Sequence, residues 1–225
     1  MHSYTEIALA SWPRRAIFES FQEFECPCYS LTVKVEAHKL QTFAKKTQES
    51  FFLLTLYALL RAANAVPQLR QRIINNTIVE FSAIDAISPI LGPHELFYHA
   101  WCGYQPEFAS FHAQCAPKLA LAQQGIEQYD PVRHDFLCAS CVPWLHFDAL
   151  SPAHSTFHQT MPLLTWGKIQ QGYIPISIKV HHGFVDGLHI GRFFEGVHQG
   201  FSQPESLYEA MPVQPAPCTA GQHRQ

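Results

Sequence analysis

Two histidines and an aspartate near one bend are the residues of this sequence best suited to chemistry. His181 and His182 follow an alternating apolar stretch, residues 176–180, and Asp186 comes four residues after His182. From Leu188 the apolar residues recur at helical spacing, so the pattern predicts a strand, a tight bend and a helix. Such a bend holds side chains rigidly at a surface, where a neutral imidazole can take a proton from a substrate hydroxyl.

A structural role for these residues is the alternative. Alternation along the strand places His181 and His182 on opposite sides, so at most one of them faces a given cleft. In this structural interpretation, backbone carbonyls accept hydrogen bonds from the two buried histidine rings, and Asp186 caps the next helix. Gly187 is expected to provide a positive φ or a close backbone approach. The bend alone does not decide between the two interpretations.

The composition predicts one domain with a sizeable apolar core. The chain has 225 residues, of which 47% are hydrophobic and 15% charged, and its net charge is -3 with neutral histidines. Lysine and arginine form no run longer than two residues, so no nucleic-acid partner is expected. No apolar stretch approaches the length of a bilayer span and no leader pattern opens the chain. We therefore expect no membrane partner and a cytoplasmic location.

The seven cysteines include two close pairs, Cys26 with Cys28 and Cys138 with Cys141. Closely spaced thiols can bind zinc, but neither pair has the turn residues of a zinc knuckle, and no helix-spaced histidine ligands occur. We expect reduced, mostly buried thiols and no metal.

Helices and strands are expected to alternate irregularly, with hairpins, which predicts an α/β or α+β fold with a mixed sheet. Asn75 and Asn76 are typical of a hairpin turn. Residues 88–93 are expected to form a loop, and the proline-rich residues 202–225 a disordered tail that leaves 1–201 as the domain. The expected helices cover residues 13–24, 39–46, 50–65, 106–123 and 188–198, and the expected strands 30–35, 69–74, 78–81, 95–101, 135–140, 142–147, 161–169 and 173–180.

The first helix begins with Arg14 and Arg15. The helix dipole does not favour cations in a first turn, so a carboxylate elsewhere in the chain is expected to pair with at least one of them.

Several separated motifs resemble one family. The bend, H-H-G-F-V-D-G, looks like the HHxxxDG signature shared by chloramphenicol acetyltransferases, dihydrolipoyl acyltransferases and the much longer condensation domains. Four further motifs resemble the chloramphenicol acetyltransferase family more specifically: W-P-R-R-A-I-F (12–18), Y-S-L-T (29–32), P-W-L-H-F-D (143–148) and P-L-L-T-W-G-K (162–168). The resemblance covers about residues 4–200. It implies a two-layer α/β sandwich with a mixed sheet, a homotrimer with active sites at subunit interfaces, acetyl-CoA as co-substrate and a small-molecule hydroxyl acceptor.

The resemblance also implies roles for single residues. His182 matches the family's general base, and Asp186 matches the carboxylate that pairs with an arginine, here Arg14. Thr165 matches a threonine that helps to hold the reaction intermediate through water. Lys168 matches a lysine near the coenzyme A phosphates, although a solvated surface lysine is an equally good interpretation.

One departure from the family leaves two hypotheses for the function. Ala149 stands where the resistance enzymes have a serine that donates a hydrogen bond to the oxyanion, and loss of such a donor costs about 10²–10³ in rate. One hypothesis is an acyl-CoA-dependent O-acetyltransferase of the antibiotic-resistance type, acting on a chloramphenicol-like acceptor. The other is a catalytically impaired family member that binds a ligand or serves in an assembly. The acceptor residues Ser20, Phe21 and 26–29 also differ, which argues against chloramphenicol itself.

Overall fold

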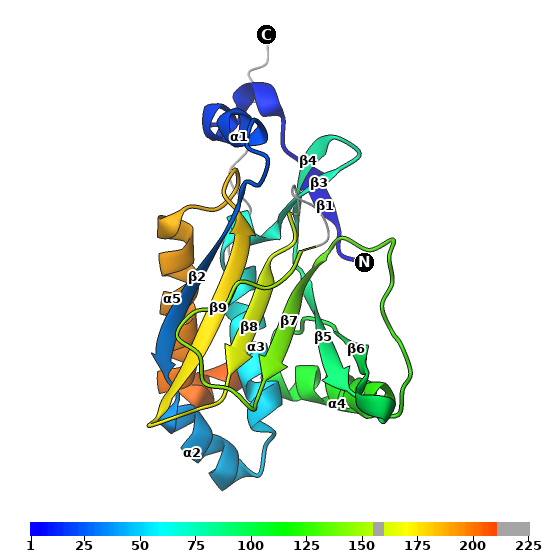
Figure 1. Ribbon diagram of the computed structural model, residues 1–225, viewed down its shortest axis with the longest axis vertical. Coiled ribbons are helices and arrows are strands. Elements are labelled where there is room, and N and C mark those ends of the chain that lie inside the picture. The colour runs from blue at the N-terminus through cyan, green and yellow to red at the C-terminus, as the bar shows by residue number, and fades with distance from the viewer. Residues whose placement is uncertain (155–159, 211–225) are drawn as a thin grey trace.

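The computed structural model describes residues 1–154 and 160–210, and Figure 1 shows their arrangement. The helices are α1 (Arg15–Gln22), α2 (His38–Thr47), α3 (Phe51–Asn64), α4 (Phe108–Gln123) and α5 (Gly187–Ser202). The strands are β1 (Tyr4–Glu6), β2 (Cys28–Glu36), β3 (Gln71–Ile74), β4 (Thr77–Phe81), β5 (Asp85–Leu91), β6 (Phe97–Cys102), β7 (Phe136–Val142), β8 (Leu163–Gly167) and β9 (Tyr173–His181). Short 3-10 helices lie at Leu9–Ser11, Pro67–Arg70, Pro93–Glu95 and Pro204–Tyr208.

The main sheet has six strands in the order β2-β9-β8-β7-β5-β6. The β5–β7 and β7–β8 pairs are parallel and the other three are antiparallel, so the sheet is mixed, as expected. Successive side chains of β9 point to opposite faces of the sheet. Ile176 and Ile178 are buried against the helices, while Ser177 and Lys179 lie on the other face.

Helices α2, α3 and α5 form a second layer against one face of this sheet, and Figure 1 views the molecule with the helices behind the strands. Helix α3 is buried along most of its length because it packs against α5, α2 and the sheet. The two layers confirm the predicted α/β sandwich. We call the sheet face turned away from this helix layer the open face. By strand register its central row consists of Thr32, Ser177, Thr165 and Ser140.

A smaller sheet of order β1-β4-β3 lies beside the main one. Strands β3 and β4 form the predicted hairpin, with Asn75 and Asn76 at φ 49° and 63°. Asparagine tolerates the two consecutive positive φ values that such a two-residue turn requires.

Two of the predicted secondary-structure elements are wrong. Residues 88–91, expected as a loop, belong to β5, because Pro89 lies in the β5–β6 ladder where β5 has no parallel neighbour beside it. Residues 143–147, expected as a strand, form a turn and an irregular segment that is tied to the end of β8 by hydrogen bonds from Lys168 N to Leu145 O and between His146 and Lys168 O.

The first residues of the predicted tail are ordered. Helix α5 runs through Ser202, and Pro204–Tyr208 form a 3-10 helix whose Leu207 is 1% exposed. Arg61 donates to Ser206 O at 2.5 Å, which holds this turn against α3. The boundary expected at residue 202 is therefore too early, and residues 211–225 lie outside the described part of the chain. No helix among the described residues is long and apolar enough to cross a bilayer.

Candidate active site

The bend between β9 and α5 closes on the last residue of β9. The backbone N–H groups of Phe184 and Val185 both donate to His181 O at 3.1 Å, and His182 N donates to Pro27 O at 2.8 Å. Gly183 is required here, since a Cβ at this position would lie 2.8 Å from Cε1 of the His181 ring. Gly187 plays a different part from the predicted one: it starts α5 without a positive φ, and a Cβ there would meet nothing within 4 Å.

An ion pair fixes this bend. Arg14, just before α1, donates to both carboxylate oxygens of Asp186 at 2.5 Å. The same guanidinium donates to His182 O at 3.1 Å and to Gly183 O at 2.7 Å. The hydrogen bond from Arg14 holds the pKa of Asp186 below its ordinary value, against the opposing effect of burial. The carboxylate expected to pair with Arg14 is thus Asp186, while Arg15 pairs with Glu19 on its own helix.

The two histidines have different environments. His181 is 1% exposed, its Nδ1 accepts from Gly183 N at 3.0 Å, and its ring packs beside those of Phe18 and Phe184. The side chain of His182 is 37% exposed. Of the two, therefore, only His182 is placed to meet a substrate.

Two rings and one carboxylate orient the His182 imidazole. The ring stacks on Phe21 at a centroid distance of 4.3 Å and an angle of 11°, and Tyr29 lies 4.5 Å away. His182 Nδ1 is a buried atom that lies 3.3 Å from Asp186 Oδ1, but the two groups are not aligned for a hydrogen bond. Burial, with a contribution from Asp186, raises the pKa of Tyr29 to about 12, so its hydroxyl stays neutral and donates to Val185 O.

Thr165 does not lie beside His182 within one chain. It pairs with Ser177 across β8 and β9 and is 4% exposed. His182 comes five residues after Ser177, which at about 3.3 Å per residue is roughly 16 Å along the strand. The structure therefore separates two of the residues that the sequence predicted for one site.

Ala149 lies at the same level of the sheet as Thr165. The next residue, Leu150, donates its N–H to Thr32 Oγ1 at 3.3 Å and accepts from Ser177 Oγ at 2.6 Å. Thr32, Ser177 and Thr165 share one row of the open face, so Ala149 and Thr165 belong to one region and His182 to another.

Sequence reasoning missed the contacts that place Ala149. Residues 148–154 follow β2 along the open face: Asp148 pairs with Lys34 at 2.6 Å, and Ser151 contacts Ser30 at 3.2 Å. Beyond them Lys179, a buried cation, donates to Pro152 O at 3.0 Å and lies 2.7 Å from His154 Nδ1. An apolar alternation with one lysine in the middle of β9 was the only sequence signal.

Lys168 borders a cavity of about 530 Å³. The cavity lies between the end of β8, the start of α3 and the end of α4, and its wall is mainly apolar and aromatic. Lys168 is exposed, and it is the one cationic side chain of the lining. The lining is Ser50, Phe51, Phe52, Pro89, Ile90, Leu91, Leu119, Gln123, Cys141, Pro143, Trp144, Trp166, Gly167, Lys168 and Ile169.

The six cysteines of the described residues are free thiols. Burial raises the pKa of Cys28 and Cys138 to about 11 and that of Cys141 to about 12, which keeps these thiols protonated. The prediction of mostly buried thiols is only partly correct: Cys102 and Cys115 are buried, Cys28, Cys138 and Cys141 are half-buried, and Cys26 is exposed. Cys218 lies outside the described residues.

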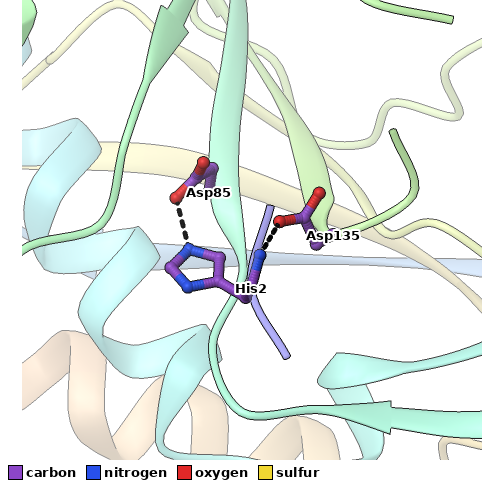
Figure 2. Close-up of side chains that lie close together, drawn as sticks. All are labelled: His2, Asp85 and Asp135. Carbon is purple, nitrogen blue, oxygen red and sulfur yellow. Dashed lines mark hydrogen bonds and ion pairs between the residues drawn. The ribbon is translucent and has the colours of Figure 1, made fainter. Parts of the chain in front are cut away.

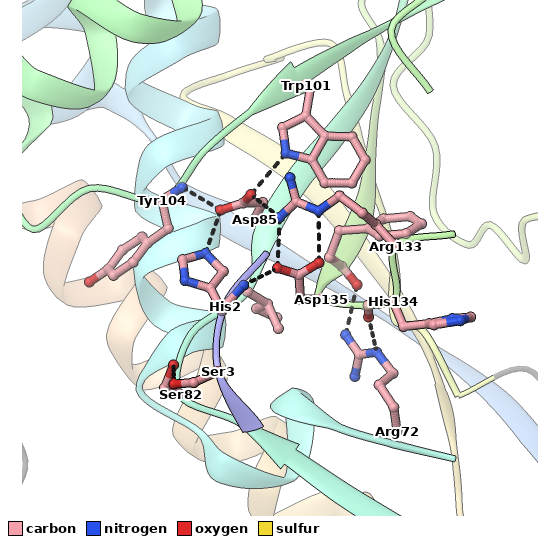
Figure 3. A network of polar contacts seen from close by, with 12 residues as sticks. His2, Ser3, Arg72, Ser82, Asp85, Trp101, Tyr104, Arg133, His134 and Asp135 are labelled. Atoms are coloured by element: carbon pink, nitrogen blue, oxygen red, sulfur yellow. Dashed lines mark hydrogen bonds and ion pairs between the residues drawn. The ribbon is translucent and has the colours of Figure 1, made fainter. Parts of the chain in front are cut away.

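A polar network unrelated to the bend holds the N-terminus. His2 Nε2 lies 2.7 Å from Asp85 Oδ1, and His2 N donates to Asp135 Oδ2 at 2.6 Å (Figure 2). These three residues are the one group of potential metal ligands found in the described part of the chain. Arg133 donates to both carboxylates, at 2.6 to 2.9 Å, and packs over the ring of Trp101 (Figure 3). Because a cation already compensates the carboxylates, we interpret this network as structural.

The fold and the bend define a class: a two-layer α/β protein of the acyltransferase type, with a half-exposed histidine held by an Arg–Asp pair. The family described as Chloramphenicol acetyltransferase matches residues 2–198. The chain belongs to the chloramphenicol acetyltransferase family.

Individual proteins agree with this assignment. Chloramphenicol acetyltransferase 2 of Escherichia coli is 29% identical, over 85% of this chain and 93% of that protein. Chloramphenicol acetyltransferase 3 of Escherichia coli is 26% identical, over 88% and 96%. A solved chloramphenicol acetyltransferase superposes with a TM-score of 0.77 at 31% identity, covering 88% of this chain and 99% of that one. A probable dihydrolipoamide acetyltransferase from Listeria monocytogenes shares the fold, with a TM-score of 0.61 at 15% identity over 88% and 94% of the chains.

Proposed function

We propose that this protein is an acetyl-CoA-dependent O-acetyltransferase in which His182 is the general base for a small-molecule hydroxyl. The observation that carries the proposal is the His182 ring, half-exposed and oriented by Phe21 and Tyr29 on a bend that Arg14 and Asp186 fix. An alcohol is a poor nucleophile at neutral pH. An imidazole that removes its proton as it attacks the thioester carbonyl typically contributes about 10²–10⁴ in rate.

The proposed reaction needs no metal. The hydroxyl oxygen forms a bond to the acetyl carbonyl carbon as His182 takes the hydroxyl proton. The bond between that carbon and the coenzyme A sulfur then breaks, and His182 gives the proton to the departing thiolate. Asp186 and Arg14 do not touch substrate in this proposal. They act as positioning residues: Arg14 donates to the backbone carbonyl of His182, and it also binds Asp186, the residue that precedes the first turn of α5.

We infer that Lys168 contributes to the site for the acyl donor. The adjacent cavity is large enough for part of a coenzyme and offers aromatic walls for an adenine ring. Lys168→Ala should raise KM for acetyl-CoA several-fold and leave kcat unchanged, since an exposed cation near phosphates contributes mainly to binding. Lys39→Ala, on exposed α2 surface outside the cavity lining, is the matched control and should change neither constant.

We further infer that the working unit is a homotrimer with its sites at subunit interfaces. The roughly 16 Å between His182 and Thr165 within one chain supports this, because one small acceptor cannot meet both residues of the same copy. The open face would then supply Thr165 to the His182 of a neighbouring copy. Sedimentation analysis of the purified protein tests the trimer, and a monomer that remains active would contradict it.

A reaction that consumes acetyl-CoA also supports a cytoplasmic location.

The acceptor is a hydroxylated small molecule, and purified protein tests the proposal directly. With acetyl-CoA and a panel of alcohols that includes chloramphenicol, free thiol should be released in the presence of at least one acceptor. His182→Gln should abolish that release while it leaves thermal unfolding unchanged, because the ring is half-exposed. No thiol release from wild-type protein with any acceptor would reject the enzyme.

Ala149 favours a second candidate, a catalytically impaired member that binds an acyl-CoA or another ligand. Restoring the oxyanion donor distinguishes the two. If the protein is impaired, Ala149→Ser should raise activity by about 10²–10³. If wild-type activity is already high and Ala149→Ser leaves it unchanged, another donor serves the oxyanion and the impaired candidate is rejected.

A further inference from the structure

His189 makes a contact that none of the proposed roles uses. It lies in the first turn of α5, is 8% exposed, and its Nδ1 accepts the backbone N–H of Asp186 at 2.9 Å. This is the reciprocal half of a capping box, with histidine in the place where glutamate or glutamine is usual. Asp186 is thereby held from two sides, by Arg14 at its carboxylate and by His189 at its amide.

We propose that His189 is a positioning residue for the catalytic bend and acts only as the neutral imidazole. The inference rests on the proposed acetyltransferase function. A backbone N–H can only donate, so Nδ1 must be without a proton and Nε2 must carry it. Protonation of Nδ1 would put two donors face to face and remove the cap.

The surroundings keep the ring neutral. The charged groups that face His189 are Arg14 before α1, Asp186 at the start of α5 and Arg192 one turn further along α5. Burial lowers the pKa of His189, both arginines lower it further, and Asp186 opposes them. The acceptor form is therefore the stable one at neutral pH and is lost on the acid side.

The contact reaches the catalytic ring through Asp186. Asp186 Oδ1 lies 3.3 Å from His182 Nδ1 and also accepts from Arg14, which in turn binds His182 O. A displacement of the Asp186 backbone would therefore move the carboxylate against which the His182 ring rests. Small displacements of this kind lower kcat more than they change substrate binding.

Two variants separate the acceptor from the charge. His189→Gln keeps an acceptor that cannot be protonated, and His189→Leu removes it. In His189→Leu, kcat should fall about tenfold with KM for acetyl-CoA unchanged, the size expected for one lost hydrogen bond. In His189→Gln, kcat should stay within about twofold of wild type. The acid limb of its kcat–pH profile should be shallower than in wild type, because residue 189 can no longer be protonated.

Arg192→Gln is the control for the charge. Arg192 is exposed and takes no part in the proposed reaction, so kcat on the alkaline plateau should not change. Loss of this cation removes one of the effects that lower the pKa of His189, so the acid limb should move to higher pH. A loss of kcat in His189→Gln as large as in His189→Leu, or no change in either variant, would overturn the proposal.

NMR decides the same question without turnover. A scalar coupling between the Asp186 amide nitrogen and His189 Nδ1 should be present at neutral pH and vanish on acidification. The ring signals of His182 should shift in His189→Leu and stay in place in His189→Gln. Absence of the coupling in folded wild-type protein rejects this inference even if acetyl transfer is observed. If wild-type protein shows the coupling and the variants show these His182 shifts, but the wild type transfers no acetyl group, only the proposed function is rejected.

Discussion

Arg14 and Asp186 are 172 positions apart in the sequence, yet the Arg14 guanidinium donates to both carboxylate oxygens of Asp186 at 2.5 Å. The same guanidinium donates to the carbonyls of His182 and Gly183. One side chain therefore joins the start of α1 to the backbone of the bend and to the first residue of α5.

Replacing Arg14 should affect both stability and activity. Arg14→Met leaves a partly buried carboxylate and two bend carbonyls without their donor, so the free energy of unfolding should fall by about 2–3 kcal/mol. Arg15→Met is the matched control, since the exposed Arg15–Glu19 pair is worth only about 0.3–0.5 kcal/mol. Urea unfolding measures both. Equal losses in the two variants would contradict the role given to Arg14.

A methyl group at Gly183 should disturb the bend. It would lie 2.8 to 2.9 Å from two atoms of the His181 ring and 3.1 Å from Phe18, so Gly183→Ala should cost about 1–3 kcal/mol. Gly191→Ala, within α5 and with open space for its Cβ, should instead stabilise the protein by about 0.5–1 kcal/mol. Thermal unfolding of both variants provides the measurement, and a stable Gly183→Ala would show that the His181 ring can move aside.

Asp85 should contribute stability that disappears in acid. Burial alone would raise its pKa, but hydrogen bonds from His2, Trp101 and Tyr104 outweigh burial and lower the pKa from 3.8 to about 2. A depressed carboxylate pKa stabilises the folded state above the unfolded value. This contribution, about 2 kcal/mol, is present above about pH 4 and is lost as the pH falls through about 2.

The matching variant is Asp85→Asn, which leaves Arg133 and His2 without one anion and should lower the free energy of unfolding at neutral pH by about 3 kcal/mol. The difference from wild type should shrink as the pH falls toward 2. Asp148→Asn, whose pair with Lys34 is on the exposed surface, should unfold like wild type. A pH-independent gap between wild type and Asp85→Asn would contradict the assigned pKa.

The turn after α5 should be part of the folded domain. Leu207 is 1% exposed against the core, so Leu207→Ala should cost about 2–4 kcal/mol. Leu188→Ala, at a leucine that is 63% exposed in the first turn of α5, should change stability by less than about 0.5 kcal/mol. If Leu207→Ala unfolds like wild type, the domain ends at α5 after all.

Much of the fold follows from local pattern. Alternation in β9, helical spacing in α3 and α5 and the Asn75–Asn76 turn were all read from the sequence, because each depends on neighbours a few residues apart. The failures fall where local signals mislead. Pro89 is typical of a loop, yet it fits within β5. Residues 142–147 are apolar enough for a strand, yet the chain leaves the sheet at Pro143. The prolines from residue 204 onward indicate disorder, whereas Leu207 is buried.

The sequence by itself determined the family, the mixed α/β sandwich and the histidine bend, because these depend on short motifs and on periodicity within single elements. Tertiary structure alone decided that His189 caps Asp186, that residues 148–154 bind the open face beside β2, and that Thr165 lies far from His182 in one chain. Those relationships depend on strand register and on contacts between distant segments, and spacing along the chain carries no information about either.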